Sequence, residues 1–241
     1  MPERTLRVCA LYPDLMNIYA DRGNLVMLER RCVWRGIGWR LHESTLGEPL
    51  HDEHDLYYIG GGQDADQRRC AADLLERKAD ALRAAAARDA VVLGVCGGYQ
   101  LLGHSYQLGE ETIPGIGLLD LHTVRSDEPR LIGNIALRLA EGTIAGFENH
   151  GGRTQLAVGQ EPLGSVLRGR GNDGRSGFEG ARRGSVFGTY VHGPLLPKNA
   201  WFCDWLTARA LHVEPESLAP LEDSLELAAH TSALRAAGVT G

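Results

Sequence analysis

The most reactive side chain that the sequence indicates is the thiol of Cys96, within the stretch GVCGG at 94–98. An apolar run of strand length, residues 90–95, comes directly before it. The spacing Gly-x-Cys-x-Gly predicts a sharp strand-to-helix turn, because side chains at the glycine positions would collide with a strained backbone. A helix start also favours a thiolate through its free amide groups. We predict a nucleophilic Cys96; the alternative is a buried structural cysteine beside a glycine turn.

A thiol nucleophile needs a general base, and the sequence offers nine histidines. His192 is the first choice, because it closes an alternating stretch predicted as a strand over 185–191 and is followed by a Gly-Pro break. This position would place its ring at an edge of the sheet, where sites form. His150 is the rival candidate and His104 a weaker one. A lone histidine is more often a structural residue, so the pairing with Cys96 carries this assignment.

A glycine run at 60–62 follows the predicted strand 55–59. Parallel strands bring their carboxyl ends to one edge of a sheet, so this loop is expected to face Cys96. We predict an oxyanion hole made by the backbone N–H of Gly62, or of Gly61, together with that of Gly97. Each such donor contributes about 3 kcal/mol to catalysis. A phosphate loop is the alternative, but neither lysine of the chain follows a glycine. A plain turn before a helix also stays open.

These loops need a rigid frame, and strands alternate with helices through the first half of the chain. This order predicts an α/β fold with a doubly wound, mostly parallel sheet and helices on both faces. The strands are expected at 6–11, 39–42, 55–59 and 90–95, and the helices at 24–35 and 64–88. In the second half, strands are expected at 131–137, 165–167 and 185–191, and helices at 201–211 and 221–237. We expect one domain over 1–241, with a core of about 6–212 and a helical extension of about 213–241.

The composition is that of a soluble globular protein with 43% hydrophobic residues and a formal net charge of −6. An acidic balance argues against a general nucleic-acid binder. No apolar run approaches the ~20 residues that span a bilayer, and no signal peptide is evident, so direct membrane insertion is not expected. Five dispersed cysteines without a C-x-x-C pair suit a reducing cytoplasm. They also remove the usual zinc patterns, so we expect no metal and no cofactor.

Several stretches together resemble the class I glutamine amidotransferases. The cysteine turn, the earlier GGG loop and a late Y-x-H-G at 190–193 are most similar to the cobyric acid synthase-like branch. Further stretches resemble the glutaminase subunit (GatD type) of lipid II isoglutaminyl synthase: IYADRGN at 18–24, RLIGN at 130–134 and GFENHGGRT at 146–154. The resemblance covers about residues 6–212 and implies a flavodoxin-like α/β architecture.

The resemblance implies that Cys96 attacks the side-chain amide of L-glutamine, while His192 transfers the protons. Arg130 would hold the substrate by its α-carboxylate, and Gln100 would lie near the substrate. The implied partner is a Mur-ligase-like, ATP-dependent synthetase that uses the ammonia to amidate the stem-peptide glutamate of lipid II. The chain would then work in the cytoplasm, at the inner face of the membrane through its partner's lipid-linked substrate.

Two departures from the family pattern matter. The usual triad has a glutamate two residues after the histidine, where this chain has Pro194, so the orienting acid must come from elsewhere. Asp21 is the first candidate and Glu148 the second. The sequence also lacks an ATP-binding motif, so a separate synthetase is expected. The rival functions are a glutaminase for another synthetase, such as a cobyrinic acid amidation, a stand-alone thiol hydrolase, and an inactive scaffold.

Overall fold

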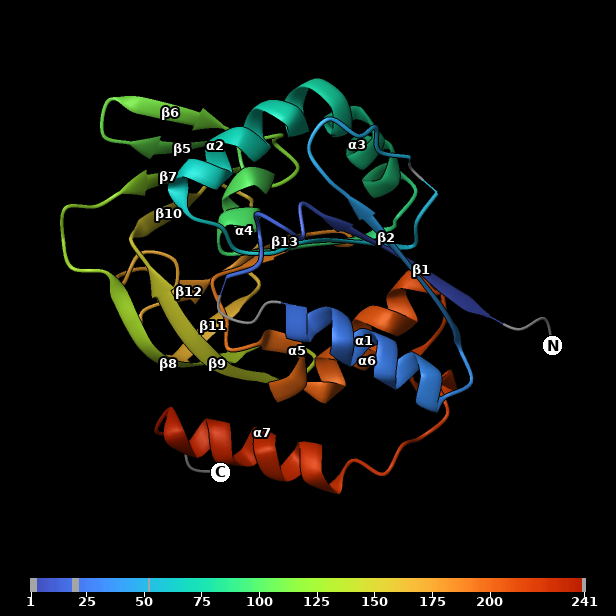
Figure 1. The fold of residues 1–241 in the computed structure, drawn as a ribbon. Coiled ribbons are helices and arrows are strands. Elements are labelled where there is room, and N and C mark those ends of the chain that lie inside the picture. Colours follow the sequence, from blue (N-terminus) through green and yellow to red (C-terminus); the bar gives the residue numbers. More distant parts are fainter. Residues whose placement is uncertain (1–3, 19–21, 52, 240–241) are drawn as a thin grey trace.

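The computed structural model describes residues 4–18, 22–51 and 53–239 of the 241-residue chain. A six-stranded sheet lies at its centre (Figure 1). Its order is β13 (Ala181–Arg183), β14 (Val186–Thr189), β4 (Val91–Val95), β3 (Leu56–Ile59), β1 (Thr5–Leu11) and β2 (Gly38–Ser44). Five of these strands are parallel, and β13 pairs antiparallel with β14. The inner strands β3 and β4 are fully buried, which is why both read as unbroken apolar runs.

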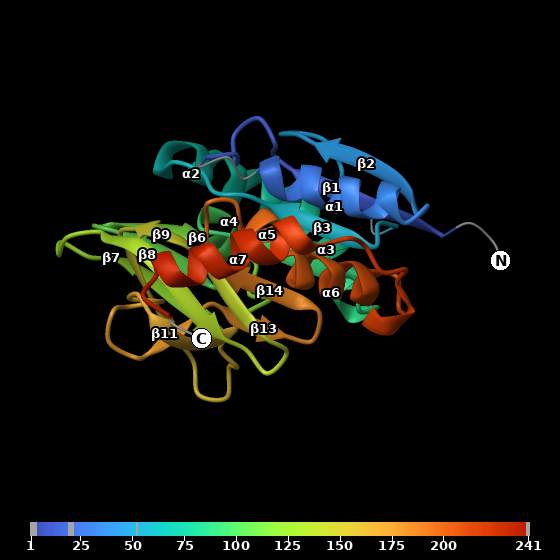
Figure 2. The same ribbon diagram turned by 90° about the horizontal axis from the view of Figure 1, so that it is seen from below.

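Helices cover both faces of this sheet, so the doubly wound prediction is confirmed (Figures 1 and 2). On one face lie α2 (Asp64–Asp73), the π-helical turn η1 (Leu74–Lys78), α3 (Ala79–Ala87) and α4 (Gly97–Leu102). On the other lie α1 (Arg22–Trp34), α5 (Leu195–Lys198) and α6 (Ala200–Ala210). The short 3-10 turn η2 (Pro215–Ser217) leads to α7 (Ser224–Ala236), which packs outside α5. Among the helices of the described ranges, none is long and apolar enough to cross a bilayer.

The second half of the chain forms two further four-stranded sheets beside the central one. One has the order β10 (Gly152–Leu156), β7 (Leu121–Arg125), β5 (Ser105–Leu108) and β6 (Glu111–Pro114). The other has the order β12 (Phe178–Glu179), β11 (Gly164–Arg168), β8 (Leu131–Arg138) and β9 (Thr143–His150). The sequence predicted β8 and β11 and missed the other six strands. Most of these are short and leave alternate residues exposed, so they produce no continuous apolar run.

The single helix predicted over 64–88 is interrupted by the π-helical turn η1. This wider turn brings the ammonium group of Lys78 to the carboxylate of Asp73, at a distance of 2.5 Å. The same ammonium donates to the backbone carbonyls of Thr45 and Glu48, at 2.9 and 2.7 Å. Lys78 is fully buried, and its three contacts use all three of its protons. It thereby ties the loop between β2 and β3 to the helical layer.

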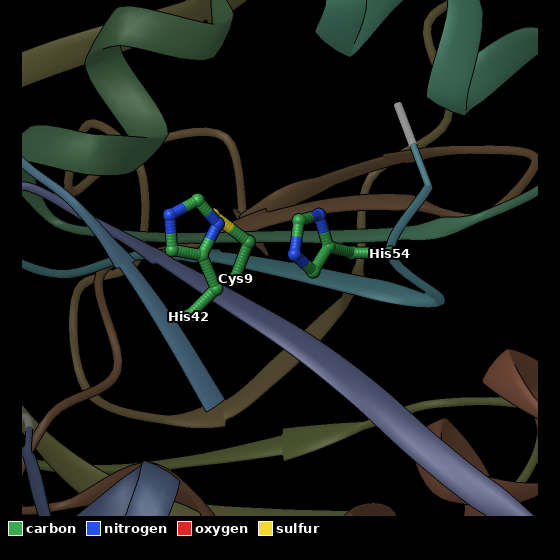
Figure 3. Close-up of side chains that lie close together, drawn as sticks. All are labelled: Cys9, His42 and His54. Carbon is green, nitrogen blue, oxygen red and sulfur yellow. The ribbon is translucent and has the colours of Figure 1, made fainter. Parts of the chain in front are cut away.

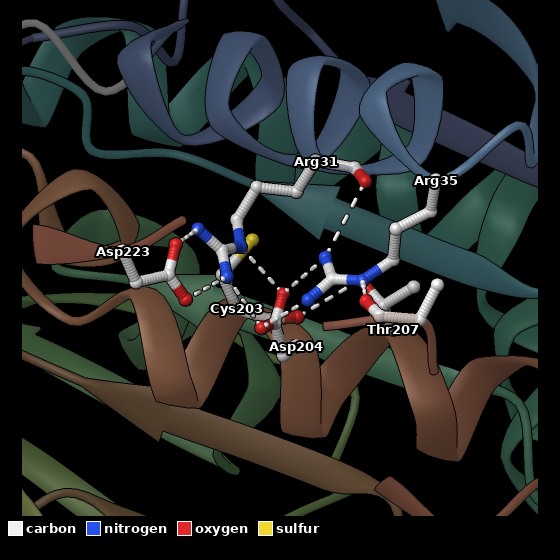
Figure 4. A network of polar contacts seen from close by, with 7 residues as sticks. Arg31, Arg35, Cys203, Asp204, Thr207 and Asp223 are labelled. Atoms are coloured by element: carbon white, nitrogen blue, oxygen red, sulfur yellow. Dashed lines mark hydrogen bonds and ion pairs between the residues drawn. The ribbon is translucent and has the colours of Figure 1, made fainter. Parts of the chain in front are cut away.

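A charged network joins α1 to α6 on the opposite face (Figure 4). The fully buried guanidinium of Arg31 binds Asp204 of α6, with Nε–Oδ1 and Nη2–Oδ2 distances of 2.5 and 2.6 Å. It also binds Asp223, just before α7, at 2.8 and 2.7 Å. Arg35 reaches the same Asp204 carboxylate. Three separate segments of the chain are therefore held by one side chain.

Candidate active site

Cys96 lies at the turn between β4 and α4 with φ 53° and ψ −105°, a strained conformation for a residue that carries a side chain. Glycine is required at both flanking positions, because neither has room for a side chain. A Cβ at Gly98 would overlap the carbonyl of Ile59, and one at Gly94 would lie 2.8 Å from the backbone of Gly98. The Cys96 amide donates to the Thr189 carbonyl at 2.8 Å, which fixes the turn against the end of β14.

The glycine loop after β3 meets the cysteine turn. A Cβ at Gly97 would lie 3.0 Å from the amide nitrogen of Gly62, so the two amide groups are close neighbours. Among the described residues, no acceptor binds either N–H group. The Gly98 amide meanwhile donates to the Gly60 carbonyl at 3.0 Å, which holds the loop and the turn together. Two free donors beside a thiol are the arrangement that stabilises an oxyanion.

A cavity of about 600 Å³ opens at this junction. It brings together five of the residues singled out in the sequence. Its lining includes Gly62, Cys96, Gln100, Arg130 and His150. This volume is enough for a small polar metabolite.

Gln100 is buried, and both ends of its amide are engaged within the protein. Its Oε1 accepts from Gln67 at 2.9 Å, and its Nε2 donates to the Tyr190 hydroxyl at 3.1 Å. The Tyr190 hydroxyl in turn contacts the Thr154 hydroxyl at 2.7 Å. The Thr154 hydroxyl contacts the Thr123 hydroxyl at 2.8 Å. This series of hydrogen bonds links α2, α4, β7 and β10. Gln67 and the two threonines lie far apart in sequence, so no local pattern indicated them.

His192 lies beyond β14, which ends at Thr189 and not at 191 as the sequence predicted. It forms an isolated bridge to Phe147 of β9, in which His192 N–H donates at 2.8 Å and its carbonyl accepts at 3.1 Å. The ring is almost fully buried. Because β14 and β4 are neighbours, the segments carrying His192 and Cys96 leave the same edge of the sheet.

His150, the rival base, also lies in the cavity wall. Its Nδ1 contacts the Gly152 carbonyl at 2.9 Å, so Nδ1 carries the proton. Its Nε2 is buried and has no hydrogen-bond partner among the described residues. Burial lowers the pKa of the imidazole to about 3, with smaller contributions from Arg153 and His192. A ring with this pKa is neutral near pH 7 and a weak base, which disfavours His150 as the proton carrier.

Of the two acids predicted to orient His192, the structure describes one, Glu148. Asp21 lies outside the described residues. Glu148 is buried, and its oxygens accept from the amides of Arg170 and Gly171 at 2.7 and 2.9 Å, in the loop after β11. Burial raises its pKa, and these amide contacts oppose that shift. Within the described part of the chain, the Glu148 carboxylate makes these amide contacts and none with His192.

A second buried acid, Glu179 of β12, was not indicated by the sequence. Its carboxylate accepts from the Tyr190 amide at 2.6 Å and from the Thr189 hydroxyl at 2.9 Å. Burial raises its pKa to about 7, against the lowering effect of these hydrogen bonds. Glu179 thus holds the segment that leads from β14 to His192.

Arg130 lies at the open side of the cavity, just before β8. Its Nε donates to the Asn149 side chain at 2.9 Å and its Nη2 to the Asn149 carbonyl at 2.8 Å. The outer edge of the guanidinium, formed by Nη1 and Nη2, makes no further bond to a described residue. That edge has the geometry for a carboxylate.

The profile of the CobB/CobQ-like glutamine amidotransferase domain matches residues 7–200. The chain belongs to this family. It is therefore an enzyme of the glutamine amidotransferase class, and the family resemblance seen in the sequence is confirmed. Among solved structures, it resembles PurLQS from Thermotoga maritima, with a TM-score of 0.59 at 20% identity over 86% of this chain and 95% of that one. A glutamine amidotransferase of the same organism gives 0.51 at 16% identity, over 96% and 95%. At these identities the likeness establishes the fold.

Curated relatives lie closer in sequence. The lipid II isoglutaminyl synthase (glutamine-hydrolyzing) subunit GatD of Streptococcus pneumoniae is 38% identical over 86% of this chain and 80% of the relative. The GatD subunit of Staphylococcus aureus is 40% identical over 82% and 81%. The cobyric acid synthase of Pelotomaculum thermopropionicum is 34% identical over 79% of this chain but only 38% of its own length. The matches to the GatD subunits therefore cover at least four fifths of this chain and of each relative.

Proposed function

We propose that this chain is the glutaminase subunit of a lipid II isoglutaminyl synthase, which hydrolyses L-glutamine and passes the ammonia to a synthetase. The observation that carries the proposal is the cysteine turn beside two free amide donors in a cavity of metabolite size. The near full-length similarity to the two GatD subunits supports the choice of acceptor.

In this mechanism the Cys96 sulfur attacks the side-chain amide carbon of glutamine, and the thiol proton passes to His192. The carbonyl oxygen becomes an oxyanion between the amides of Gly62 and Gly97. When the tetrahedral intermediate collapses, the C–N bond breaks, and His192 gives its proton to the departing nitrogen. The products are ammonia and a γ-glutamyl thioester on Cys96.

Water then attacks the thioester carbon, and His192 accepts one proton from it. The oxyanion of the second tetrahedral intermediate again accepts hydrogen bonds from the same two amides. The C–S bond breaks, the sulfur is reprotonated, and glutamate leaves. In each half of the reaction, His192 takes a proton in the attack step and returns it in the collapse step, so no external acid is needed.

Arg130 binds the substrate in this mechanism, because its open guanidinium edge fits the α-carboxylate of glutamine. Asn149 keeps this edge turned outward through two hydrogen bonds. Gln100 lines the cavity near the substrate, and its hydrogen bonds to Gln67 and Tyr190 hold it in place. Asp21 and Glu148 stay the candidates for the acid that orients His192.

The ammonia acceptor requires a partner, because amide synthesis at a carboxyl group needs ATP and the sequence carries no ATP-binding motif. We propose a Mur-ligase-like synthetase that activates the stem-peptide glutamate of lipid II. The complex would work in the cytoplasm, at the inner face of the membrane that carries this lipid.

The main rival is glutamine hydrolysis for another synthetase, such as one that amidates cobyrinic acid. The cobyric acid synthase matched here is much longer than this chain, which spans 38% of it. The GatD subunits are more similar to this chain, at 38 and 40% identity against 34% for that synthase, which favours the GatD function. Co-purification with a Mur-ligase-like protein supports our proposal, and co-purification with a corrinoid-binding synthetase contradicts it.

The direct test is ammonia release from L-glutamine by the purified chain, with and without its co-purified synthetase. We expect release from the wild type and from Cys32→Ala, which removes a buried thiol of α1, and none from Cys96→Ala. A chloroketone analogue of glutamine should add its mass to Cys96. The proposal would be refuted if Cys96→Ala released as much ammonia as the wild type, or if the complete complex released none.

A further inference from the structure

A second group of reactive side chains lies on the central sheet, at its β2 edge. Cys9 of β1 and His42 of β2 are register partners, so their side chains leave the same face of the sheet side by side. His54, in the loop before β3, stacks its ring on His42 with centroids 5.2 Å apart. Figure 3 shows the three side chains gathered beside the two strands.

The donor atoms are already close enough for one ion. The Cys9 sulfur and one nitrogen from each imidazole all lie within 4.8 Å of one another. Neighbouring ligands of a tetrahedral zinc ion, at about 2.0–2.3 Å from the metal, are separated by roughly 3.5 Å. Small side-chain rotations would therefore close the site without moving the backbone.

These donors are available. Among the described residues, neither ring nitrogen of His42 has a hydrogen-bond partner, and His54 has only a 3.4 Å contact from Nδ1 to the His51 carbonyl. Cys9 is fully buried and free, whereas both histidines are half-buried and face solvent in part. An ion would enter from the histidine side.

The surroundings hold the third ligand in place. The His54 amide lies 3.2 Å from the Tyr57 hydroxyl, and its carbonyl accepts from Arg88 at 2.6 Å. Lys78, near Cys9, is paired with Asp73 at 2.5 Å. Arg7, near His54, is paired with Asp55 at 2.6 Å. Glu48 lies near His42. The local charge thus does not oppose a divalent cation.

We propose that Cys9, His42 and His54 form a zinc site, with one thiolate, two imidazoles and water as the fourth ligand. Thiolate with imidazole is the donor set that zinc prefers. On binding, the Zn–S bond forms as the Cys9 thiol gives its proton to solvent. The ion would join β2, at the edge of the sheet, to the loop before β3. No sequence pattern indicated this site, because the three residues share no local spacing.

The test is zinc titration of the chelator-treated full chain against a chromophoric competitor. We expect one ion per chain, and a loss of affinity of at least about a hundredfold in His42→Asn and His54→Asn, since even outer-shell changes cost 10–100-fold. His51→Asn is the matched control, because the exposed His51 contributes its carbonyl and not its ring. It should bind zinc as the wild type does.

Two further readouts do not depend on competition. Cobalt(II) should give a thiolate charge-transfer band in the wild type and in Cys32→Ser, but not in Cys9→Ser. Saturating zinc should raise the melting temperature by at least about 5 °C in the wild type and not in His42→Asn. The proposal is wrong if the wild type binds no zinc, if His42→Asn binds it equally well, or if His51→Asn loses as much affinity.

Discussion

The imidazole of His150 lies flat on the phenol ring of Tyr190, with centroids 3.7 Å apart and ring planes 2° apart. This stack places a neutral histidine against the network that holds Gln100. One ring nitrogen is committed to the Gly152 carbonyl, so the other presents a lone pair to the cavity wall. We therefore predict that His150 is a polar acceptor in the site and that proton transfer falls to His192.

The pH dependence of stability tests this state. The pKa of His150 falls from 6.5 to about 3 on folding, so between these values the unfolded chain binds the extra proton. Stability from this group is complete above about pH 6.5 and is lost as the pH falls below it. Between pH 7.5 and 5.5, wild type should lose about 1 kcal/mol more than His150→Gln in urea denaturation. Parallel pH profiles would show that the folded ring is not held neutral.

Glu179 should show the opposite slope. Its pKa rises from 4.5 to about 7 on folding, so the folded state holds the extra proton in between. The ionised form is penalised, and stability from this group falls as the pH rises from about 4.5 to 7. Relative to wild type, Glu179→Gln should gain about 2 kcal/mol between pH 5 and pH 8, measured by urea denaturation. A difference that does not change with pH would contradict the raised pKa.

Backbone strain at Cys96 gives a prediction about two inactive variants. Both Cys96→Ala and Cys96→Gly remove the proposed nucleophile, but only glycine adopts φ 53° and ψ −105° without strain. The relief of about 1–3 kcal/mol exceeds the entropic cost of glycine, about 0.5–1 kcal/mol. Cys96→Gly should thus be more stable than Cys96→Ala by about 1 kcal/mol in thermal or urea unfolding. Greater stability of the alanine variant would mean that the turn is unstrained.

The strands and loops around Cys96 were predictable because each depends on local sequence. The runs at 55–59 and 90–95 are buried on both faces, and glycines mark the two loops that meet. Glu179 and the Cys9 cluster were not predictable, because they depend on pairing between distant strands. His192 was singled out from the sequence, but its position beyond the end of β14 was not, because that position depends on its bridge to Phe147.

Arg130 should govern glutamine binding more than turnover. Arg130→Ala removes the open guanidinium edge, and we expect a rise in glutamine KM of at least about tenfold, since a charge-assisted pair contributes 1.5–3 kcal/mol. Arg130→Lys keeps the charge without the paired donors and should fall in between. Calorimetric binding of glutamine to Cys96→Ala, with and without Arg130→Ala, separates binding from chemistry. An unchanged affinity would remove Arg130 from the binding site.

The Arg31 network predicts unequal costs for two neighbouring arginines of α1 (Figure 4). Arg31 is fully buried and holds two carboxylates, whereas Arg35 shares only Asp204. Arg31→Met leaves Asp223 without its partner and should lower the free energy of unfolding by about 3 kcal/mol. Arg35→Met leaves Asp204 paired with Arg31 but removes the bond to the Ala219 carbonyl, and it should cost about 1.5 kcal/mol. Urea denaturation at pH 7 compares the two. Equal losses would mean that the contact with Asp223 adds nothing, and that α7 is held by its other contacts, such as that of His230 with the Lys198 carbonyl at 2.9 Å.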